Sequence, residues 1–322
     1  MATYKEINGI KIQSVSSDPP APFIGEVWYN SGSETIKYRQ GATSAAWSTG
    51  GNLGGSNYNI RGAGTQTAAF SAGGYPDQDG TEEYDGSSWT AGGNMNNNNS
   101  DGATAGTLTA GLYFGNDSGP KATTEEYNGT SWTTSNAMGT GRLALAGAGT
   151  QTAALAIGGA PGPGVITNAV EEYNGSSWTA GGALPSPVER NAGCGTQTAA
   201  LSMGGEPPPS GSTLSKEYNG SSWTNGGAMN VQRKKSGAAG LQTAALAFGG
   251  SNSGAALVST ELYNGSSWTT TANLNTAKNE TAGAGIQSAA LAFGGESPGG
   301  KTSTTEEYNA AAPAATRTVG TD

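Results

Sequence analysis

Short apolar segments separated by glycine-rich turns recur along the chain, and none shows the 3.6-residue apolar period of an amphipathic helix. A segment of small residues, such as 143–148, leads through a tight turn into an apolar segment, such as 243–248, that ends at two glycines. A third segment, such as 170–173, is joined by the Asn-Gly-Ser-Ser sequence of 174–177 to a fourth around Trp178. Asn-Gly between two strands is typical of a type I′ hairpin turn, because both residues tolerate a positive φ. We therefore predict an all-β chain with four short antiparallel strands in each repeat.

These repeats hold a common register. The sequence Gly-Thr-Gln-Thr-Ala-Ala at Gly64 returns with small changes in four later repeats, and a degenerate copy begins at Gly106. Each repeat also carries a tyrosine, followed in all but the last by a tryptophan five residues later; the tyrosines are Tyr84, Tyr127, Tyr173, Tyr218, Tyr263 and Tyr308, and the tryptophans, with Trp47 ahead of them, are Trp89, Trp132, Trp178, Trp223 and Trp268. A disordered chain has no reason to keep this register, so we expect a folded repeat protein.

Four antiparallel strands every 40 to 50 residues fit the blade of a β-propeller. A strand that ends in Gly-Gly, followed by Tyr and Trp at these spacings, resembles the kelch repeat over about residues 51 to 310. The resemblance implies that the tyrosines and tryptophans fill the space between blades. We interpret the glycines as positions of close approach near the central axis.

The number of blades depends on the two ends of the chain. Six repeats carry the glycine register, while Tyr38 and Trp47 supply a further third and fourth strand, and residues 25–30 a second strand. Residues 316–319 are then a substitute outer strand for the last repeat. This arrangement predicts seven blades. If the Trp47 strand instead closes the last blade, the number is six.

Residues 1–50 differ from the repeats of 51–322, and we expect them to form an imperfect first blade that the repeats complete into a propeller. A proline-rich stretch at 17–22 precedes the sequence Gly-Glu-Val-Trp-Tyr-Asn at 25–30, which is followed by a turn, a short strand and Trp47. This order resembles a motif of bacteriophage tail-fibre and other virion proteins. Together with the kelch-like repeats, the chain is similar to propeller proteins encoded by marine and cyanobacterial phages.

The amino-acid composition excludes several kinds of catalytic, metal-binding and nucleic-acid-binding site. The 322 residues include 54 glycines, one cysteine and no histidine, with 12% charged residues and a net charge of −9. The lack of histidine excludes Ser-His-Asp and Cys-His catalysis and histidine-ligated metals, and a lone Cys194 excludes an internal disulfide. The acidic balance argues against nucleic-acid binding. No apolar run approaches the roughly 20 residues of a membrane span and no signal peptide is recognised, so we expect synthesis in the host cytoplasm without membrane insertion.

Several repeated polar residues admit both a structural and a binding interpretation. Acidic pairs precede four of the tyrosines (Glu82-Glu83, Glu125-Glu126, Glu171-Glu172 and Glu306-Glu307) and would form a ring able to bind cations, but alternation sends each pair to opposite faces. We favour a solvated outer strand whose charge prevents edge pairing. Arg142, Arg233 and Lys278 recur at one position, where ion pairs with neighbouring glutamates are preferred over an anionic ligand. The sequons at Asn128, Asn174, Asn219 and Asn264 are explained by turn chemistry, and Cys194 by packing.

The two faces of the predicted propeller differ in variability. The turns between strands 1 and 2 and between strands 3 and 4 are nearly constant, and they lie on what we call the constant face. The 2–3 loops and the 4–1 loops, which join successive blades, vary in length and chemistry on the opposite, variable face. Binding residues concentrate on loops held by a rigid scaffold. The candidate ligand-binding residues on this face are Tyr75, Asp77, Asp79, Lys121 and Glu206.

The sequence therefore predicts a non-enzymatic virion protein, exposed on the tail or capsid in several copies, that recognises a host-surface glycan or protein. We expect no cofactor and no metal, and the partners would be other virion proteins. A purely structural decoration or adaptor protein is the first alternative. A cellular or secreted kelch-like scaffold is the second.

Overall fold

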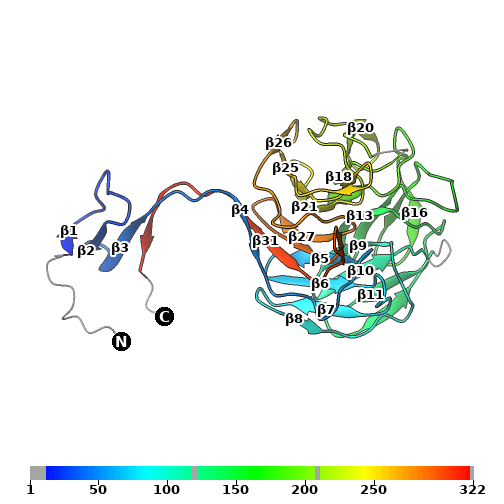
Figure 1. The fold of residues 1–322 in the computed structure, drawn as a ribbon, viewed down its shortest axis with the longest axis horizontal. Helices are drawn as coiled ribbons and strands as arrows, with labels where there is room; N and C mark the ends of the chain where they lie inside the picture. The colour runs from blue at the N-terminus through cyan, green and yellow to red at the C-terminus, as the bar shows by residue number, and fades with distance from the viewer. Residues whose placement is uncertain (1–11, 118–121, 207–210, 320–322) are drawn as a thin grey trace. The chain divides into compact units, whose positions relative to one another are not determined.

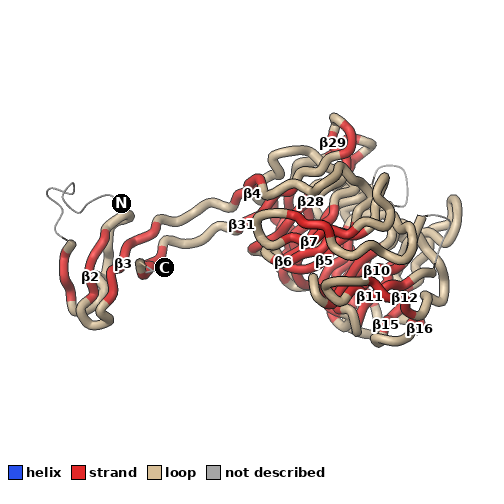
Figure 2. The backbone as a smooth tube through the Cα atoms, turned by 90° about the horizontal axis from the view of Figure 1, so that it is seen from below, coloured by secondary structure: helices blue, strands red, loops and turns tan. Residues whose placement is uncertain are grey.

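The computed structural model describes residues 12–117, 122–206 and 211–319, and these contain strands but no helix (Figure 2). The chain divides into two compact units. Unit 1 comprises Met1–Ala45 with Ala310–Asp322, and unit 2 comprises Ala46–Asn309. The candidate residue Lys121 lies outside the described residues.

Unit 2 contains six four-stranded antiparallel sheets among its described residues, which we number as blades 1 to 6. From the first strand to the fourth, blade 1 is β5 (Arg61–Thr65), β6 (Ala68–Ala72), β7 (Thr81–Tyr84) and β8 (Trp89–Ala91); blade 2 is β9 (Ala103–Thr107), β10 (Ala110–Phe114), β11 (Thr124–Tyr127) and β12 (Trp132–Ser135); blade 3 is β13 (Ala146–Thr150), β14 (Ala153–Ile157), β15 (Val170–Tyr173) and β16 (Trp178–Ala180). Blade 4 is β17 (Ala192–Thr196), β18 (Ala199–Met203), β19 (Ser215–Tyr218) and β20 (Trp223–Asn225); blade 5 is β21 (Gly237–Leu241), β22 (Ala244–Phe248), β25 (Thr260–Tyr263) and β26 (Trp268–Thr270); blade 6 is β27 (Ala282–Ile286), β28 (Ala289–Phe293), β31 (Thr305–Asn309) and β4 (Ala46–Thr49). Two small hairpins, β23 (Ser251–Asn252) with β24 (Ala255–Ala256) and β29 (Glu296–Ser297) with β30 (Gly300–Lys301), lie in the 2–3 loops of blades 5 and 6.

The first strands of the six blades contact one another in turn, and β27 contacts β5, so the ring is closed. Figure 1 shows these strands at the centre of unit 2, with β8, β16, β20 and β26 at its periphery. Blade 6 takes its outer strand from the N-terminal side of the chain, because β4 pairs with β31 and places Trp47 opposite Tyr308. The all-β propeller is thus confirmed, with the six-blade closure that the sequence left as the alternative.

The described residues do contain a seventh four-stranded sheet, but it belongs to unit 1 and corrects the seven-blade prediction. Its strands are β1 (Gln13–Val15), β2 (Val27–Asn30), β3 (Thr35–Gln40) and β32 (Ala315–Thr318), and β1 pairs in parallel with β2. Strand β32, expected at the edge of the last blade, pairs with β3 instead. The chain therefore divides at residues 45/46 and 309/310 rather than at residue 50.

The Asn-Gly hairpins are longer than the predicted type I′ turns. Tyr173 pairs with Trp178, which leaves a four-residue loop, and only Gly175 in that loop has a positive φ, of 86°. The Asn174 side chain accepts hydrogen bonds from the backbone N–H groups of Ser176 and Ser177, at 3.0 and 2.8 Å. The asparagine therefore serves as a side-chain turn cap, and the glycine alone supplies the left-handed conformation.

The core lies between successive blades. In one such cluster Phe114 of blade 2 packs against Trp178 of blade 3, with ring centroids 4.9 Å apart, and Tyr173 packs on the same tryptophan. Small residues on the first strands complete the cluster, because they let adjacent blades approach closely near the axis. The tyrosines and tryptophans that repeat along the sequence are thus the residues that pack between successive blades.

The tryptophan indoles add a hydrogen bond between blades, with one exception. Each Nε1 donates to a hydroxyl on the first residue of the third strand in the preceding blade, in the pairs Trp47–Thr260, Trp89–Thr305, Trp132–Thr81, Trp178–Thr124 and Trp268–Ser215. In blade 3 that first residue is Val170, and the buried Nε1 of Trp223 has no hydrogen-bond partner in the described part of the chain. Among these tryptophan indoles, that of Trp223 is therefore the one unpaired donor in the described blades, and a single hydroxyl would satisfy it.

Replacing Val170 by threonine is expected to raise the free energy of unfolding by about 1 kcal/mol, because the new hydroxyl accepts the Trp223 indole hydrogen bond. Denaturant unfolding followed by tryptophan fluorescence measures the change. The matched control is Thr124→Val, which creates the same defect at Trp178 and should lower stability by about 1–3 kcal/mol. Destabilisation by Val170→Thr as well as by Thr124→Val would contradict the prediction, because it would show that the added hydroxyl does not accept the Trp223 hydrogen bond.

Candidate functional site

The glutamate that directly precedes a repeat tyrosine joins adjacent blades. A tyrosine hydroxyl donates to the glutamate of the preceding blade in the pairs Tyr84–Glu307, Tyr127–Glu83, Tyr173–Glu126, Tyr218–Glu172 and Tyr263–Glu217. Leu262 stands at the sixth position, where the Tyr308 hydroxyl pairs with that of Thr271 at 2.9 Å. These glutamates are therefore engaged in hydrogen bonds that hold adjacent blades together.

The tyrosine hydroxyls make the ring sensitive to high pH. Burial, followed by the hydrogen bond to Glu83, raises the pKa of Tyr127 to about 12. A raised tyrosine pKa means that its contribution to stability is fully present below pH 10, the unfolded value, and is lost as the pH rises toward 12. We expect the stability of the protein to fall between pH 10 and 12. Tyr127→Phe, which keeps the ring packing, should flatten that fall, and denaturation at a series of pH values tests it; an unchanged slope would contradict this assignment.

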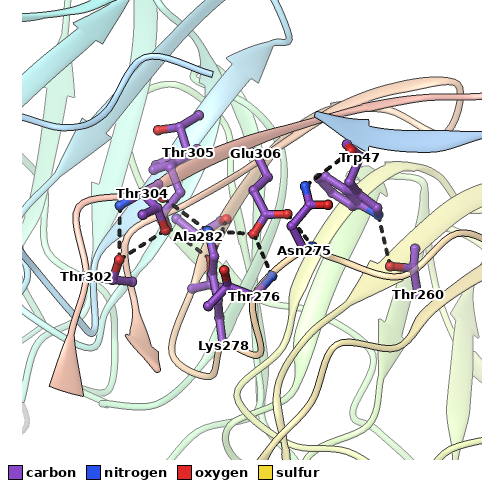
Figure 3. Close-up of polar contacts among 12 residues, drawn as sticks. Trp47, Thr260, Asn275, Thr276, Lys278, Ala282, Thr302, Thr304, Thr305 and Glu306 are labelled. Carbon is purple, nitrogen blue, oxygen red and sulfur yellow. Dashed lines mark hydrogen bonds and ion pairs between the residues drawn. The ribbon is translucent and has the colours of Figure 1, made fainter. Parts of the chain in front are cut away.

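The glutamate at the second position of the third strand holds the incoming 4–1 loop. It also forms the ion pairs predicted for Arg142, Arg233 and Lys278. In Figure 3, Glu306 accepts the backbone N–H of Asn275 at 2.6 Å and lies 3.3 Å from Lys278 Nζ. Arg142–Glu171 and Arg233–Glu261 form the equivalent ion pairs, at 2.9 and 2.7 Å. The predicted structural pairing of these cations is confirmed.

The glutamates at this second position are largely buried, so the predicted solvated outer strand is wrong. Glu125, Glu261 and Glu306 are at most 3% exposed, and Glu125 accepts hydrogen bonds from the loop residues Asn96 and Asn97. The alternative, a ring of cation ligands, is not formed either, because the carboxylates bond to their own loops. No group of three possible metal-ligating side chains occurs within the described ranges.

The constant face is likewise used for joining blades. The Gln151 side chain, in the turn between β13 and β14, donates to the carbonyls of Gly111 and Tyr127 in the preceding blade, at 2.9 and 2.8 Å. Gln66, Gln197, Gln242 and Gln287 make the same pair of bonds. The repeated glutamines of this face thus bond adjacent blades to one another.

Cys194 is buried on β17, and burial raises the pKa of its thiol to about 12.

The variable face carries a second, non-repeating ring at one mouth of the central axis. One residue per blade, five positions before the turn glycine, has a left-handed φ between 53° and 57°; we call this set the axial ring, and it comprises Asn59, Asp101, Ala144, Arg190, Lys235 and Glu280. From Asp101 onward, the N–H of each member donates to the carbonyl of the member before it, at 2.7 to 3.2 Å. A uniform backbone thus presents six different side chains around the axis.

The axial ring borders a cavity of about 100 Å³, and charged side chains line it in compensated pairs. Arg61 Nη2 lies 2.7 Å from Asp101 Oδ1, and Lys235 pairs with Glu280. Burial raises the pKa of Asp101, while the charge of Arg61 opposes the shift. Next to the cavity, Glu206 pairs with Lys234 and, at 3.5 Å, with Arg190.

Three polar atoms on residues that line this cavity are buried and have no hydrogen-bond partner among the described residues. They are Arg190 Nε, Asn191 Oδ1 and Ser236 Oγ. Asn191 is 7% exposed, and its Nδ2 donates to Ser202 Oγ at 2.9 Å. Because buried polar atoms are normally paired, these three mark a place where a ligand or ordered water would bind.

The four predicted site residues that the structure describes fall on the variable face but not at one point. Glu206 joins the axial mouth, whereas Tyr75 and Asp77 are exposed on the 2–3 loop of blade 1. Asp79 is bonded to the neighbouring 4–1 loop, where its carboxylate accepts from Asn94 at 3.3 Å.

The axial ring itself was missed, although the sequence held a signal for it. The position five residues before each turn glycine is occupied by six different residue types in six repeats. A comparison of the repeats position by position would therefore have separated it from the surrounding conserved spacing.

No protein-family model matches the chain, and no curated protein matches it by sequence. Among solved structures, "Structure of YjhT" aligns with a TM-score of 0.66 and 13% identity, covering 83% of this chain and 99% of that one. At this identity the likeness concerns the fold alone. It agrees with the closed ring of four-stranded sheets, and the chain is a β-propeller protein.

Proposed function

We propose that this protein is a non-catalytic recognition propeller of a bacteriophage virion, which binds a host-surface ligand through the variable face of unit 2. One observation carries the proposal. The repeated polar residues bond between blades or to their own loops, whereas the polar residues that differ from blade to blade meet at the axial mouth. The virion setting rests on the resemblance of the segment around residues 25–30.

A binding role fits the chemistry of the mouth better than catalysis. Both carboxylates that line the cavity, Asp101 and Glu280, are paired with cations. A glycoside hydrolase needs two carboxyl groups that are free to serve as acid and as base or nucleophile. Paired carboxylates instead orient neighbouring donors, which suits recognition. Several copies on one particle would compensate for a weak single site.

Competition with phage adsorption tests the proposal. The purified full chain should reduce adsorption of the phage to its host, and the double variant Arg190→Ala, Lys235→Ala should lose this effect. The matched control is Thr150→Ala with Thr196→Ala, two exposed residues of the constant face that should compete like the unmodified chain. Undiminished competition by the variable-face variant would refute recognition through this face.

Attachment to the particle is a second candidate function, and the sheet of unit 1 favours it. One face of that sheet carries Val27, Tyr29, Ile36 and Val319, each 36 to 46% exposed. The other face buries Trp28, whose Nε1 donates to Asp18 at 3.1 Å. An uncovered apolar face next to a buried one is typical of a docking surface. Electron cryomicroscopy of the particle tests it: a tail-tip position supports recognition, and a capsid-lattice position supports decoration.

A further inference from the structure

The variable face combines unpaired hydrogen-bonding atoms on residues of the axial cavity with an exposed aromatic ring on the 2–3 loop of blade 1. From this combination we propose that this face binds a neutral saccharide, with a pyranose ring stacked on Tyr75 and its hydroxyl groups bonded in the axial cavity. The inference rests on the proposed recognition function and names the ligand class.

The aromatic ring stands beside the axial ring. The N–H of Tyr75 donates to the carbonyl of Tyr58 at 2.8 Å, and Tyr58 directly precedes Asn59 of the axial ring. The two tyrosine rings lie 5.6 Å apart, and Lys301 Nζ lies 5.6 Å from the Tyr75 ring centroid. Tyr75 is nevertheless 48% exposed.

No other blade presents an aromatic residue at this place. The residues paired across the same positions in four other blades are Leu143–Ala160, Glu189–Glu206, Lys234–Ser251 and Asn279–Glu296, and in blade 2 Asp117 donates to Ser100. An oriented, half-exposed aromatic ring offers an apolar face to the C–H groups of a pyranose and keeps a polar edge toward water. Among the described residues, these paired positions beside the axial ring therefore offer one aromatic stacking position.

The unpaired atoms of the cavity require both donors and acceptors from a ligand. Arg190 Nε can only donate, Asn191 Oδ1 can only accept, and Ser236 Oγ can do either. A carboxylate or phosphate cannot donate to Asn191. Saccharide hydroxyl groups donate and accept, so a single class of ligand satisfies all three atoms.

The charges and the size of the axial cavity also favour a neutral saccharide. Each of the cations Arg61, Arg190, Lys234 and Lys235 already lies in an ion pair, with Glu206 serving both Arg190 and Lys234, so none of these four is without a carboxylate. A cavity of about 100 Å³ is well below the roughly 300 Å³ at which pockets begin to enclose a drug-sized ligand. Only the hydroxylated edge of a ligand enters it, and the remainder lies on the rim. This arrangement fits the end of a neutral glycan better than a large aromatic peptide anchor.

The test uses the full chain on arrays of neutral oligosaccharides of glucose, galactose, mannose, rhamnose and N-acetylglucosamine, with uronic-acid oligosaccharides and random peptides alongside. We expect neutral saccharides to bind. Tyr75→Ala should weaken binding at least tenfold and Ser236→Ala severalfold, while Tyr75→Phe should stay within about threefold, because it keeps the stacking surface. Tyr29→Ala, which removes an exposed tyrosine from unit 1, is the matched control and should bind normally.

Several results would overturn the inference: binding of uronic acids or peptides only, unchanged binding by Tyr75→Ala, or no binding to any neutral saccharide. The adsorption competition decides the proposed function separately. If Arg190→Ala, Lys235→Ala abolishes competition while neutral saccharides do not bind, recognition stands and the ligand class is wrong. If that variant competes normally, the recognition function itself has failed.

Discussion

Replacing Arg233 by alanine is expected to lower the free energy of unfolding of the propeller by about 3–5 kcal/mol. The side chains of Arg233 and Glu261 are completely buried, with Nη2 and Oε1 2.7 Å apart. The same guanidinium donates to the carbonyls of Gly249 and Ser259, each at 2.9 Å. Alanine would remove these bonds and leave a buried carboxylate without its cation, which costs far more than the intact pair contributes. Denaturant unfolding followed by tryptophan fluorescence measures the loss.

Two further variants serve as controls for the Arg233→Ala result. Arg190→Ala removes a cation that is 35% exposed and 3.5 Å from Glu206, so its cost should stay below about 1 kcal/mol. Blade 4 places Val188 and Lys216 where blade 5 has Arg233 and Glu261. The double variant Arg233→Val, Glu261→Lys recreates that combination and should be more stable than Arg233→Ala. A loss below 1 kcal/mol for Arg233→Ala would show that the buried pair does not hold the 4–1 loop.

The repeated architecture could be read from the sequence because its determinants are local. The third strand at 170–173 and the turn at 174–177 follow from residues that are neighbours in the chain, and the structure has them there. The same holds for the aromatic register, since five of the six repeat tyrosines pair with the tryptophan five residues later. Repetition then made each local signal visible in at least five places.

The closure of the ring depends on a pairing that no local pattern specifies. Trp47 lies opposite Tyr308, at the other end of the repeats, while Tyr38 lies in a different sheet of unit 1. From composition alone, both could belong to one blade. Which tyrosine the tryptophan faces is decided by the space left in blade 6, which lacks a tryptophan of its own.

The candidate site was predicted only in outline, for a related reason. The alternation of Glu125 and Glu126 shows that they face opposite sides of a strand, but not that one contacts a loop and the other a tyrosine of the next blade. Likewise, Arg190 and Ser236 come together only because successive blades meet at the axis. Contacts between blades depend on the angle and the distance of packing, which a single repeat does not encode.

Trp47→Ala is expected to destabilise the propeller by about 3–5 kcal/mol, because it removes the aromatic side chain that closes the ring. Trp47 packs against Phe248 of blade 5 and Tyr308 of blade 6, with centroids 5.1 and 5.2 Å apart, and its Nε1 donates to Thr260 at 3.1 Å (Figure 3). Denaturant unfolding followed by circular dichroism, which does not depend on the lost indole, measures the change. Trp28→Ala is the matched control, since Trp28 is also buried but lies in unit 1, and it should leave the main transition within about 0.5 kcal/mol. A seven-blade ring that included the unit 1 sheet would make the two substitutions comparably damaging, whereas six-blade closure by β4 requires a large effect from Trp47 alone.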